Sequence, residues 1–93
     1  MPVRFISRIT KIDDKRLGFY VPKYVTEFYE LKPGDYKGGI SETHGEVNSC
    51  PIRLFKIRRT LRGVLPPKIG QKGTVVEVWI YRDTWRAIKN KVV

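Results

Sequence analysis

The stretch RLGFYVPKYVTEFYELKPGDY, residues 16–36, contains the signals that decide the fold. It opens with an aromatic and β-branched run at residues 17–21, which is typical of a strand. Pro22 cannot continue a central strand but suits the first turn of a helix. Apolar residues then recur at helical spacing, at Tyr24, Val25, Phe28, Tyr29 and Leu31. Pro33 and Gly34 predict a type II turn, because proline sets φ for the first central residue and glycine accepts the positive φ of the second. The stretch therefore predicts a strand, a helix of about two turns, and a turn.

Strands are predicted on both sides of this stretch. Residues 5–12 alternate apolar and polar side chains, and residues 13–16 form a polar break of hairpin length. We therefore expect residues 5–12 and 17–21 to pair as a hairpin. A further strand is predicted over residues 36–41. The glycine-rich segment 37–51 predicts a loop that separates the two halves of the chain.

The second half predicts more β structure and a short helix. In residues 52–59 apolar side chains are interleaved with cations, which favours a strand, and residues 59–63 are predicted to turn. Residues 73–81 alternate cleanly, with Val76, Val78 and Ile80 on one face. Asp83 or Thr84 is predicted to cap a last short helix in which Trp85 and Ile88 lie one turn apart.

Length and composition set the class. Ninety-three residues suffice for one domain, and 41% hydrophobic with 30% charged residues is typical of a globular chain. No apolar run approaches the 20 or so residues of a membrane span. Arg4 and Arg8 disfavour a secretory signal, and a single cysteine, Cys50, fits a reducing compartment. We therefore expect a cytoplasmic protein, associated with the nucleoid or with a ribonucleoprotein.

Charge is distributed unevenly along the chain. The formal net charge is +10; residues 1–46 hold eight basic and seven acidic side chains, whereas residues 47–93 hold eleven and two. No acidic residue occurs over residues 47–76. A basic stripe of this kind favours a polyanion, most commonly nucleic acid. The residues of the second half predicted to meet phosphate are Arg53, Lys56, Arg58, Arg59, Arg62 and Lys68.

The order of RLGFYVPK (residues 16–23) and ELKPGDY (residues 30–36), separated by a helix length, resembles the AbrB/MazE swapped-hairpin family over residues 5–40. The resemblance implies a DNA-binding module in which two chains interleave their hairpins into one small barrel. It also implies that cations of the first hairpin and its flanks touch DNA, which at matching positions are Arg8, Lys11, Lys15, Arg16 and Lys23.

The predicted fold class is thus α+β, mostly β: a small swapped-hairpin barrel with one short helix and a basic β-rich C-terminal extension. Residues 1–41 form the AbrB-like segment, residues 42–51 a glycine-rich polar loop, and residues 52–93 a basic segment packed into the same domain. A faint echo of residues 18–24 in residues 63–69 is interpreted as coincidence among common turn residues rather than as a second repeat.

Catalysis and metal binding are not indicated. One histidine and one cysteine, His44 and Cys50, are too few for a zinc site and fall in a predicted loop. No phosphate-binding glycine motif occurs. We expect no enzyme activity, no cofactor, no metal and no small-molecule substrate. Trp79 and Tyr81 are interpreted as core or dimer interface, with an exposed base-stacking platform as the alternative.

The leading functional hypothesis is a homodimeric, double-stranded DNA-binding transcriptional regulator or chromatin-type protein. The alternative is an RNA-binding structural component of a ribonucleoprotein such as a ribosome, since residues 70–78 are similar to the KOW motif of small RNA-binding barrels. An antitoxin-like protein-interaction module is a third possibility.

Overall fold

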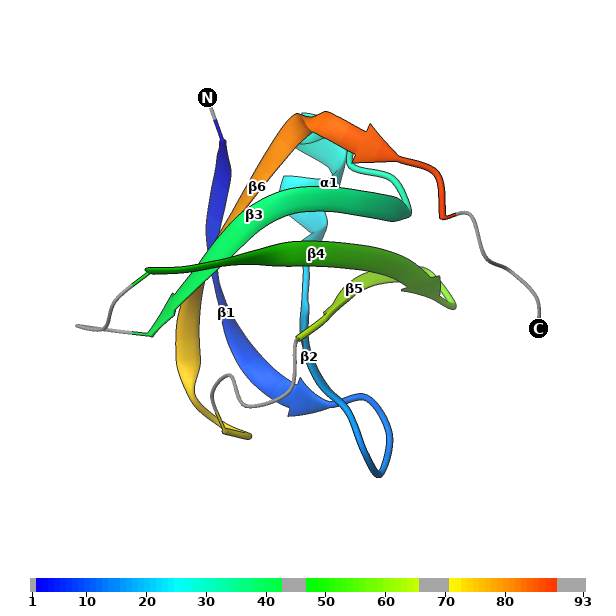
Figure 1. The fold of residues 1–93 in the computed structure, drawn as a ribbon. Coiled ribbons are helices and arrows are strands. Elements are labelled where there is room, and N and C mark those ends of the chain that lie inside the picture. Colours follow the sequence, from blue (N-terminus) through cyan, green and yellow to red (C-terminus); the bar gives the residue numbers. More distant parts are fainter. Residues whose placement is uncertain (1, 43–46, 66–70, 89–93) are drawn as a thin grey trace.

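The computed structural model describes residues 2–42, 47–65 and 71–88. Within these residues, six antiparallel strands form a closed barrel in the order β1-β2-β5-β4-β3-β6, accompanied by one short helix (Figure 1). The elements are β1 (Val3–Lys11), β2 (Leu17–Tyr20), α1 (Lys23–Tyr29), β3 (Gly34–Glu42), β4 (Val47–Ile57), β5 (Thr60–Val64) and β6 (Val75–Arg86). The protein is therefore a small, mostly β barrel. No helix in the described part of the chain has the length and apolar character needed to cross a membrane.

The first hairpin forms as the sequence predicts. β1 pairs with β2 from Ile9 opposite Phe19 to Lys11 opposite Leu17. The intervening turn is organised by Asp13, whose Oδ1 accepts hydrogen bonds from the backbone N–H groups of Lys15 at 2.9 Å and Arg16 at 2.8 Å. Such side-chain to backbone bonds are the reason that aspartate is favoured in turns.

The predicted two-turn helix is also present. Pro22 lies at its N-terminal boundary, and Glu30 ends it in the left-handed conformation with φ of 53°. Only Val25 of this helix is buried, so α1 covers the barrel with a narrow apolar contact and leaves Tyr24 and Phe28 exposed.

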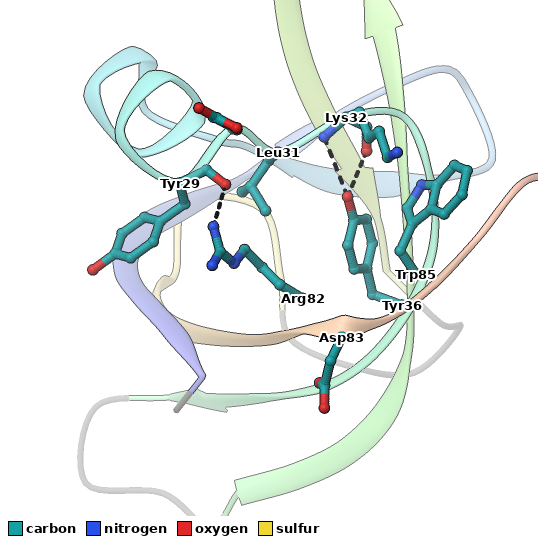
Figure 2. A pocket seen from close by; sticks show the side chains of 8 residues that line it. Tyr29, Leu31, Lys32, Tyr36, Arg82, Asp83 and Trp85 are labelled. Carbon is teal, nitrogen blue, oxygen red and sulfur yellow. Dashed lines mark hydrogen bonds between the residues drawn. The ribbon is translucent and has the colours of Figure 1, made fainter.

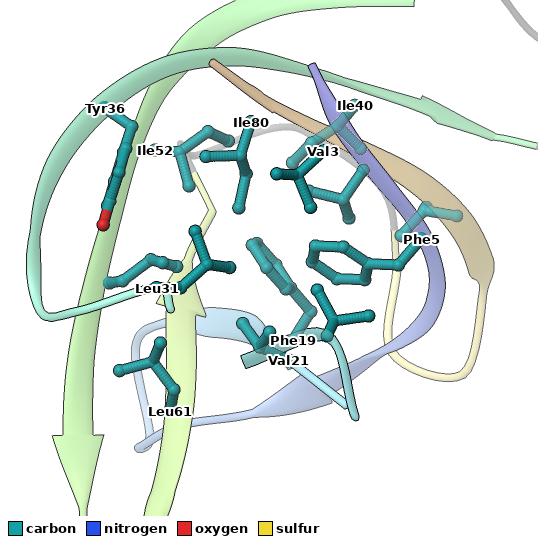
Figure 3. Packing of buried hydrophobic residues seen from close by; sticks show 14 of the residues in the cluster. Val3, Phe5, Phe19, Val21, Leu31, Tyr36, Ile40, Ile52, Leu61 and Ile80 are labelled. Carbon is teal, nitrogen blue, oxygen red and sulfur yellow. The ribbon is translucent and has the colours of Figure 1, made fainter. Parts of the chain in front are cut away.

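The core fills the barrel interior with side chains from every strand (Figure 3). Val76, Val78 and Ile80 are fully buried, which confirms the predicted inner face of residues 73–81. Both halves of the chain contribute, because β2 pairs with β5 and β3 lies between β4 and β6. The two halves are thus parts of one domain.

Phe19 is the largest fully buried side chain, and it occupies the space in front of Gly63 on the neighbouring strand. A Cβ atom at position 63 would collide with the Phe19 ring. Glycine in a strand commonly marks such a close approach.

The swapped-hairpin arrangement is not confirmed. All six strands of the barrel come from one chain, so the barrel closes without a second copy. The predicted homodimer is a separate matter and stays a prediction.

Two segments predicted as a loop and a turn are largely strand in the structure. The expected loop over residues 42–51 is largely sheet, since β3 extends to Glu42 and β4 begins at Val47. The expected turn at residues 59–63 is the strand β5, and the chain reverses instead at Arg58 and Arg59. Gly38, at the start of the glycine-rich segment, and Gly63 do not mark loops, because each lies in a strand where a neighbouring strand or ring leaves no room for a side chain.

The predicted C-terminal helix is wrong. β6 continues to Arg86, and its pairing with β3 shifts register between Asp35 and Lys37. The Thr84 hydroxyl, expected to cap a helix, donates to the carbonyl of Tyr81 at 2.6 Å and accepts from the backbone N–H of Lys37 at 2.8 Å. The bond from Lys37 of β3, together with the β3–β6 backbone pairing, outweighs the weak local helical spacing.

Candidate nucleic-acid interface

The structure separates the predicted phosphate contacts into two groups at different ends of the barrel. β5 runs antiparallel to β2, with Tyr20 opposite Arg62 and Gly18 opposite Val64. The β4–β5 turn therefore lies at the end of β2 away from the β1–β2 turn, and the two turns are well separated in Figure 1. Lys11, Lys15 and Arg16 belong to the first turn region, and Lys56, Arg58 and Arg59 belong to the second.

Several cations of the first group have partners within the protein. Arg16 pairs with Asp13 at 2.9 Å, and Lys11 lies 4.0 Å from Asp14. The pKa of Asp13 is lowered below its usual value, mainly by the hydrogen bond from the backbone N–H of Lys15 and next by the hydrogen bond from the Arg16 side chain. Arg8 donates to the carbonyl of Gly73 at 2.9 Å. Lys15 has no side-chain partner among the described residues.

Arg53 also has a carboxylate partner. It donates from Nε and Nη2 to the two oxygens of Asp35, at 2.7 and 3.1 Å, across the β3–β4 pair. Although residues 47–76 contain no acidic residue, the fold places Asp35 of β3 beside this segment, and its carboxylate largely neutralises the charge of Arg53.

Arg62 is a structural residue. It is only 8% exposed, and its Nη2 donates to the Thr10 hydroxyl at 2.8 Å and to the Lys11 carbonyl at 3.2 Å. The guanidinium carbon lies 4.3 Å from the centre of the Tyr20 ring. Arg62 thus connects β5 to β1 across β2, and little of its guanidinium is accessible to a phosphate.

Three of the predicted contacts, Lys23, Lys56 and Arg59, line a groove between α1 and the β4–β5 hairpin, and Arg58 is next to Arg59 in the hairpin turn. This groove, of about 450 Å³, is lined by Tyr20, Val21, Lys23, Thr26, Glu27, Lys56, Arg59, Thr60 and Leu61. Lys56, Arg58 and Arg59 form no ion pair or side-chain hydrogen bond within the described part of the chain, and Lys23 has only an exposed contact with Glu27 at 4.0 Å. We call Lys23, Lys56, Arg58 and Arg59 the tip cluster. The sequence predicted Lys56, Arg58 and Arg59 in one basic segment and Lys23 in another, and the fold brings Lys23 to the groove that Lys56 and Arg59 line.

Arg58 adopts a backbone conformation that is unusual for arginine. Its φ is 59°, in the left-handed region that two-residue hairpins normally fill with glycine or asparagine. A non-glycine residue held there costs on the order of 1 kcal/mol or more. The arginine at this position therefore lowers the free energy of unfolding. Strained residues of this kind cluster at functional sites. Lys68, the last predicted contact, lies outside the described residues.

A second hollow, of about 330 Å³, lies between the α1–β3 connection and β6 (Figure 2). Its cations already contact the protein: Lys32 Nζ lies 3.9 Å from the centre of the Trp85 ring, and Arg82 donates to the Tyr29 carbonyl at 2.6 Å. The Tyr36 hydroxyl donates to the Lys32 carbonyl at 2.7 Å, and burial raises the pKa of this tyrosine. These contacts hold β6 against the end of α1 and the α1–β3 connection. We therefore assign the residues of this hollow a structural role.

Chemistry at Cys50 finds no support in its surroundings. The side chain is half-buried on β4, and burial raises the pKa of its thiol, which disfavours the reactive thiolate. His44 lies outside the described residues. Among the residues that the structure describes, no three histidine, cysteine or carboxylate side chains are grouped as a metal would require.

Comparisons with known proteins leave the family open: no family model matches the chain, and neither the curated proteins nor the solved structures contain a match.

Proposed function

We propose that this protein binds nucleic acid and that the tip cluster contacts its phosphate backbone. The observation that carries the proposal is that Lys56, Arg58 and Arg59 lack carboxylate partners in the described part of the chain, while Arg16 and Arg53 have them. Unpaired cations are those that can exchange their counterions for phosphates without first breaking an internal ion pair.

The surroundings of the tip cluster favour a polyanion. Glu27 is the one carboxylate among the residues lining the groove, against Lys23, Lys56 and Arg59. The chain as a whole carries a formal net charge of +10, which adds long-range attraction for any nucleic acid. Backbone contacts of this type position a protein on its ligand and carry little sequence information.

Double-stranded DNA is the leading ligand, and a role in transcription regulation or chromatin organisation follows if it is the one bound. This preference depends on the resemblance of residues 5–40 to the AbrB/MazE family. RNA presents the same phosphates, so a ribonucleoprotein component is the second candidate. A binding experiment must therefore compare duplex DNA with RNA.

The test is a salt series of binding measurements on a duplex DNA and a hairpin RNA of matched length. If log affinity falls with log salt by about 0.9 per phosphate contact, the double variant Arg58→Ala with Arg59→Ala reduces the slope on duplex DNA by roughly two. The matched control is Arg16→Ala with Arg53→Ala, which removes the same charge from two arginines that already pair with Asp13 and Asp35.

The control should leave the slope nearly unchanged. An equal reduction by both double variants would mean that net charge, rather than the tip cluster, determines binding. A wild-type protein with no measurable affinity for either ligand at low salt would overturn the proposal. A tenfold preference for the RNA would replace the DNA-binding role with the ribonucleoprotein role.

A further inference from the structure

A third hollow lies on the outer surface of the barrel, over β6, β3 and β4. It measures about 240 Å³ and is lined by Gly38, Gly39, Val47, Ser49, Trp79 and Tyr81. We call it the outer groove. Trp79 and Tyr81 alternate with the buried residues Val78 and Ile80 along β6, so both aromatic side chains point out of the barrel. They are not part of the core, so that half of the favoured interpretation is wrong, while the dimer interface, its other half, stays a prediction.

Gly39 provides the floor of the groove. It pairs with Trp79 on one side and with Ser49 on the other, so the outer surface has no side chain between these two residues. A Cβ atom here would lie 3.1 Å from Val47 Cγ1 and 3.3 Å from the Asn48 carbonyl oxygen, which is tight but not prohibitive. The backbone does not require glycine by a positive φ. Glycine in a strand costs about 0.5 to 1 kcal/mol relative to alanine, and its effect here is to keep the groove open.

One aromatic wall of the groove is exposed, and the other is half-buried and held in place. Tyr81 is 44% exposed, and Val47, which also lines the groove, is 56% exposed, whereas Trp79 is half-buried. On the β1 side of Trp79, the Arg4 guanidinium lies 5.5 Å from the indole centre and is anchored by Glu77 at 2.8 Å. The indole is therefore supported on the side away from the groove.

The rim of the groove carries positive charge. Lys37 is exposed, pairs with Tyr81 across the β3–β6 ladder, and forms no side-chain interaction with any described residue. An aromatic surface next to an unpaired cation suits a ligand that is flat and apolar on its faces and anionic at its edge. A nucleotide of a single strand has this chemistry, because its base can stack while its phosphate meets the cation.

We propose that the outer groove stacks an unpaired base of single-stranded nucleic acid on Trp79 and Tyr81, with Lys37 contacting the adjoining phosphate. The site is distinct from the tip cluster: β4 runs from the groove at Val47 and Ser49 to the hairpin tip beyond Ile57 (Figure 1). It rests on the proposed function only for the class of ligand, nucleic acid, and it adds a second contact that unpaired nucleotides can make and a continuous duplex cannot.

The experiment compares a single-stranded oligothymidine with an abasic strand of the same length, which has the same phosphates and no bases. Stacking of one base is expected to make the wild-type protein bind oligothymidine roughly 5- to 150-fold more tightly. Tyr81→Ala and Gly39→Val should each bring this ratio toward one, while affinity for the abasic strand stays unchanged. Tryptophan fluorescence should be quenched by oligothymidine and not by the abasic strand.

Two controls locate the effect. Tyr24→Ala removes another exposed tyrosine, on α1, and should leave the ratio unchanged. The Arg58→Ala with Arg59→Ala variant should weaken binding of both strands by the same factor. If Gly39→Val fails to fold by circular dichroism, Tyr81→Ala alone decides, because its side chain is outside the core.

The outcomes separate the two proposals. Equal wild-type affinity for both strands overturns the stacking site and leaves phosphate binding at the tip cluster standing. A preference for oligothymidine that survives Tyr81→Ala, or that Tyr24→Ala abolishes, overturns the location. If the wild-type protein binds neither of the two strands and no duplex, the proposed function and this inference are both overturned.

Discussion

Arg53 and Asp35 lie directly opposite each other on β4 and β3 and form a two-point ion pair, with Nε 2.7 Å from one carboxylate oxygen and Nη2 3.1 Å from the other. The two residues are 18 positions apart in the chain. The pair shows why a run of cations without local acids overstates the charge available to a ligand: the fold supplies the acid.

The same pair predicts a dependence of stability on pH. The Arg53 hydrogen bond lowers the pKa of Asp35 below its unfolded value of 3.8. The pair therefore contributes fully above about pH 3.8, and its contribution is lost as the pH falls through the lower, folded pKa. For a pair this exposed we expect Asp35→Asn to cost about 0.2 to 1 kcal/mol at neutral pH.

Urea unfolding of the wild type and Asp35→Asn, at neutral pH and in acid, measures this effect. The difference between the two proteins should vanish in acid. Asp14→Asn is the matched control, since the Asp14 side chain is fully exposed and lies 4.0 Å from its lysine; it should unfold like the wild type throughout. A difference between wild type and Asp35→Asn that persists unchanged in acid would contradict the assignment.

Arg58→Gly should change stability and binding in opposite directions. Glycine accepts φ of 59° without the steric cost that arginine bears, so the free energy of unfolding should rise by roughly 0.5 to 1 kcal/mol. The loss of one tip-cluster cation should reduce the salt slope for nucleic acid by about one. Thermal melts and the salt series measure the two quantities. Arg59→Gly is the control, because Arg59 lacks the positive φ and should gain no stability.

Gly34→Val should destabilise the barrel strongly. Gly34 has a φ of 153°, which differs from the roughly +80° of the predicted type II turn but is still a region that valine avoids. A Cβ atom there would also collide with the Trp85 indole, whose Nε1 donates to the Pro33 carbonyl at 2.9 Å. We expect a loss of roughly 2 to 4 kcal/mol. Gly39→Ala, with ordinary φ and room for a methyl group after a small shift, should cost much less; equal losses would refute this reasoning.

Gly63→Ala should be destabilising because of Phe19 alone. The added methyl group meets the Phe19 ring, which predicts a loss of about 1 to 3 kcal/mol. Phe19→Leu removes the ring, so the double variant should be more stable than the sum of the single losses predicts, with a coupling of about 0.5 to 3 kcal/mol. Additive losses in denaturant titrations of the four proteins would contradict this contact.

Folding should not require a second chain. Because one chain closes the barrel and buries its own core, a sample diluted until light scattering reports only monomer should still melt cooperatively, and its melting temperature should not change on further dilution. A dimer of folded chains would raise the melting temperature only at the concentrations where light scattering detects it. A chain that is unfolded wherever it is monomeric would show that an interleaved or obligate dimer is the folded species.

The sequence by itself determined the elements whose signals act over a few residues. Alternation placed the strands near residues 5–12 and 73–81, and an aromatic and β-branched run placed the strand near residues 17–21. Pro22, together with Pro33 and Gly34, bounded the helix that follows this strand. These signals are local because backbone sterics and side-chain period depend on neighbours along the chain. Composition likewise predicted one small domain with a basic second half.

The tertiary structure decided which distant residues meet. It made strands of the glycine-rich segments, because Gly38 and Gly63 lie where another strand or ring leaves no room for a side chain. It extended β6 through the expected helix, since pairing with β3 supplied hydrogen bonds that the local spacing could not foresee. It also paired Arg53 with Asp35, and Arg62 with Thr10, 52 residues away.

The same long-range register left Lys56, Arg58 and Arg59 without a carboxylate partner among the described residues, and it aligned Gly39 with Trp79. Whether a cation is free, or an aromatic ring exposed, depends on strand pairing over the whole barrel. That pairing is a property of the closed sheet, and no short segment of the sequence contains it.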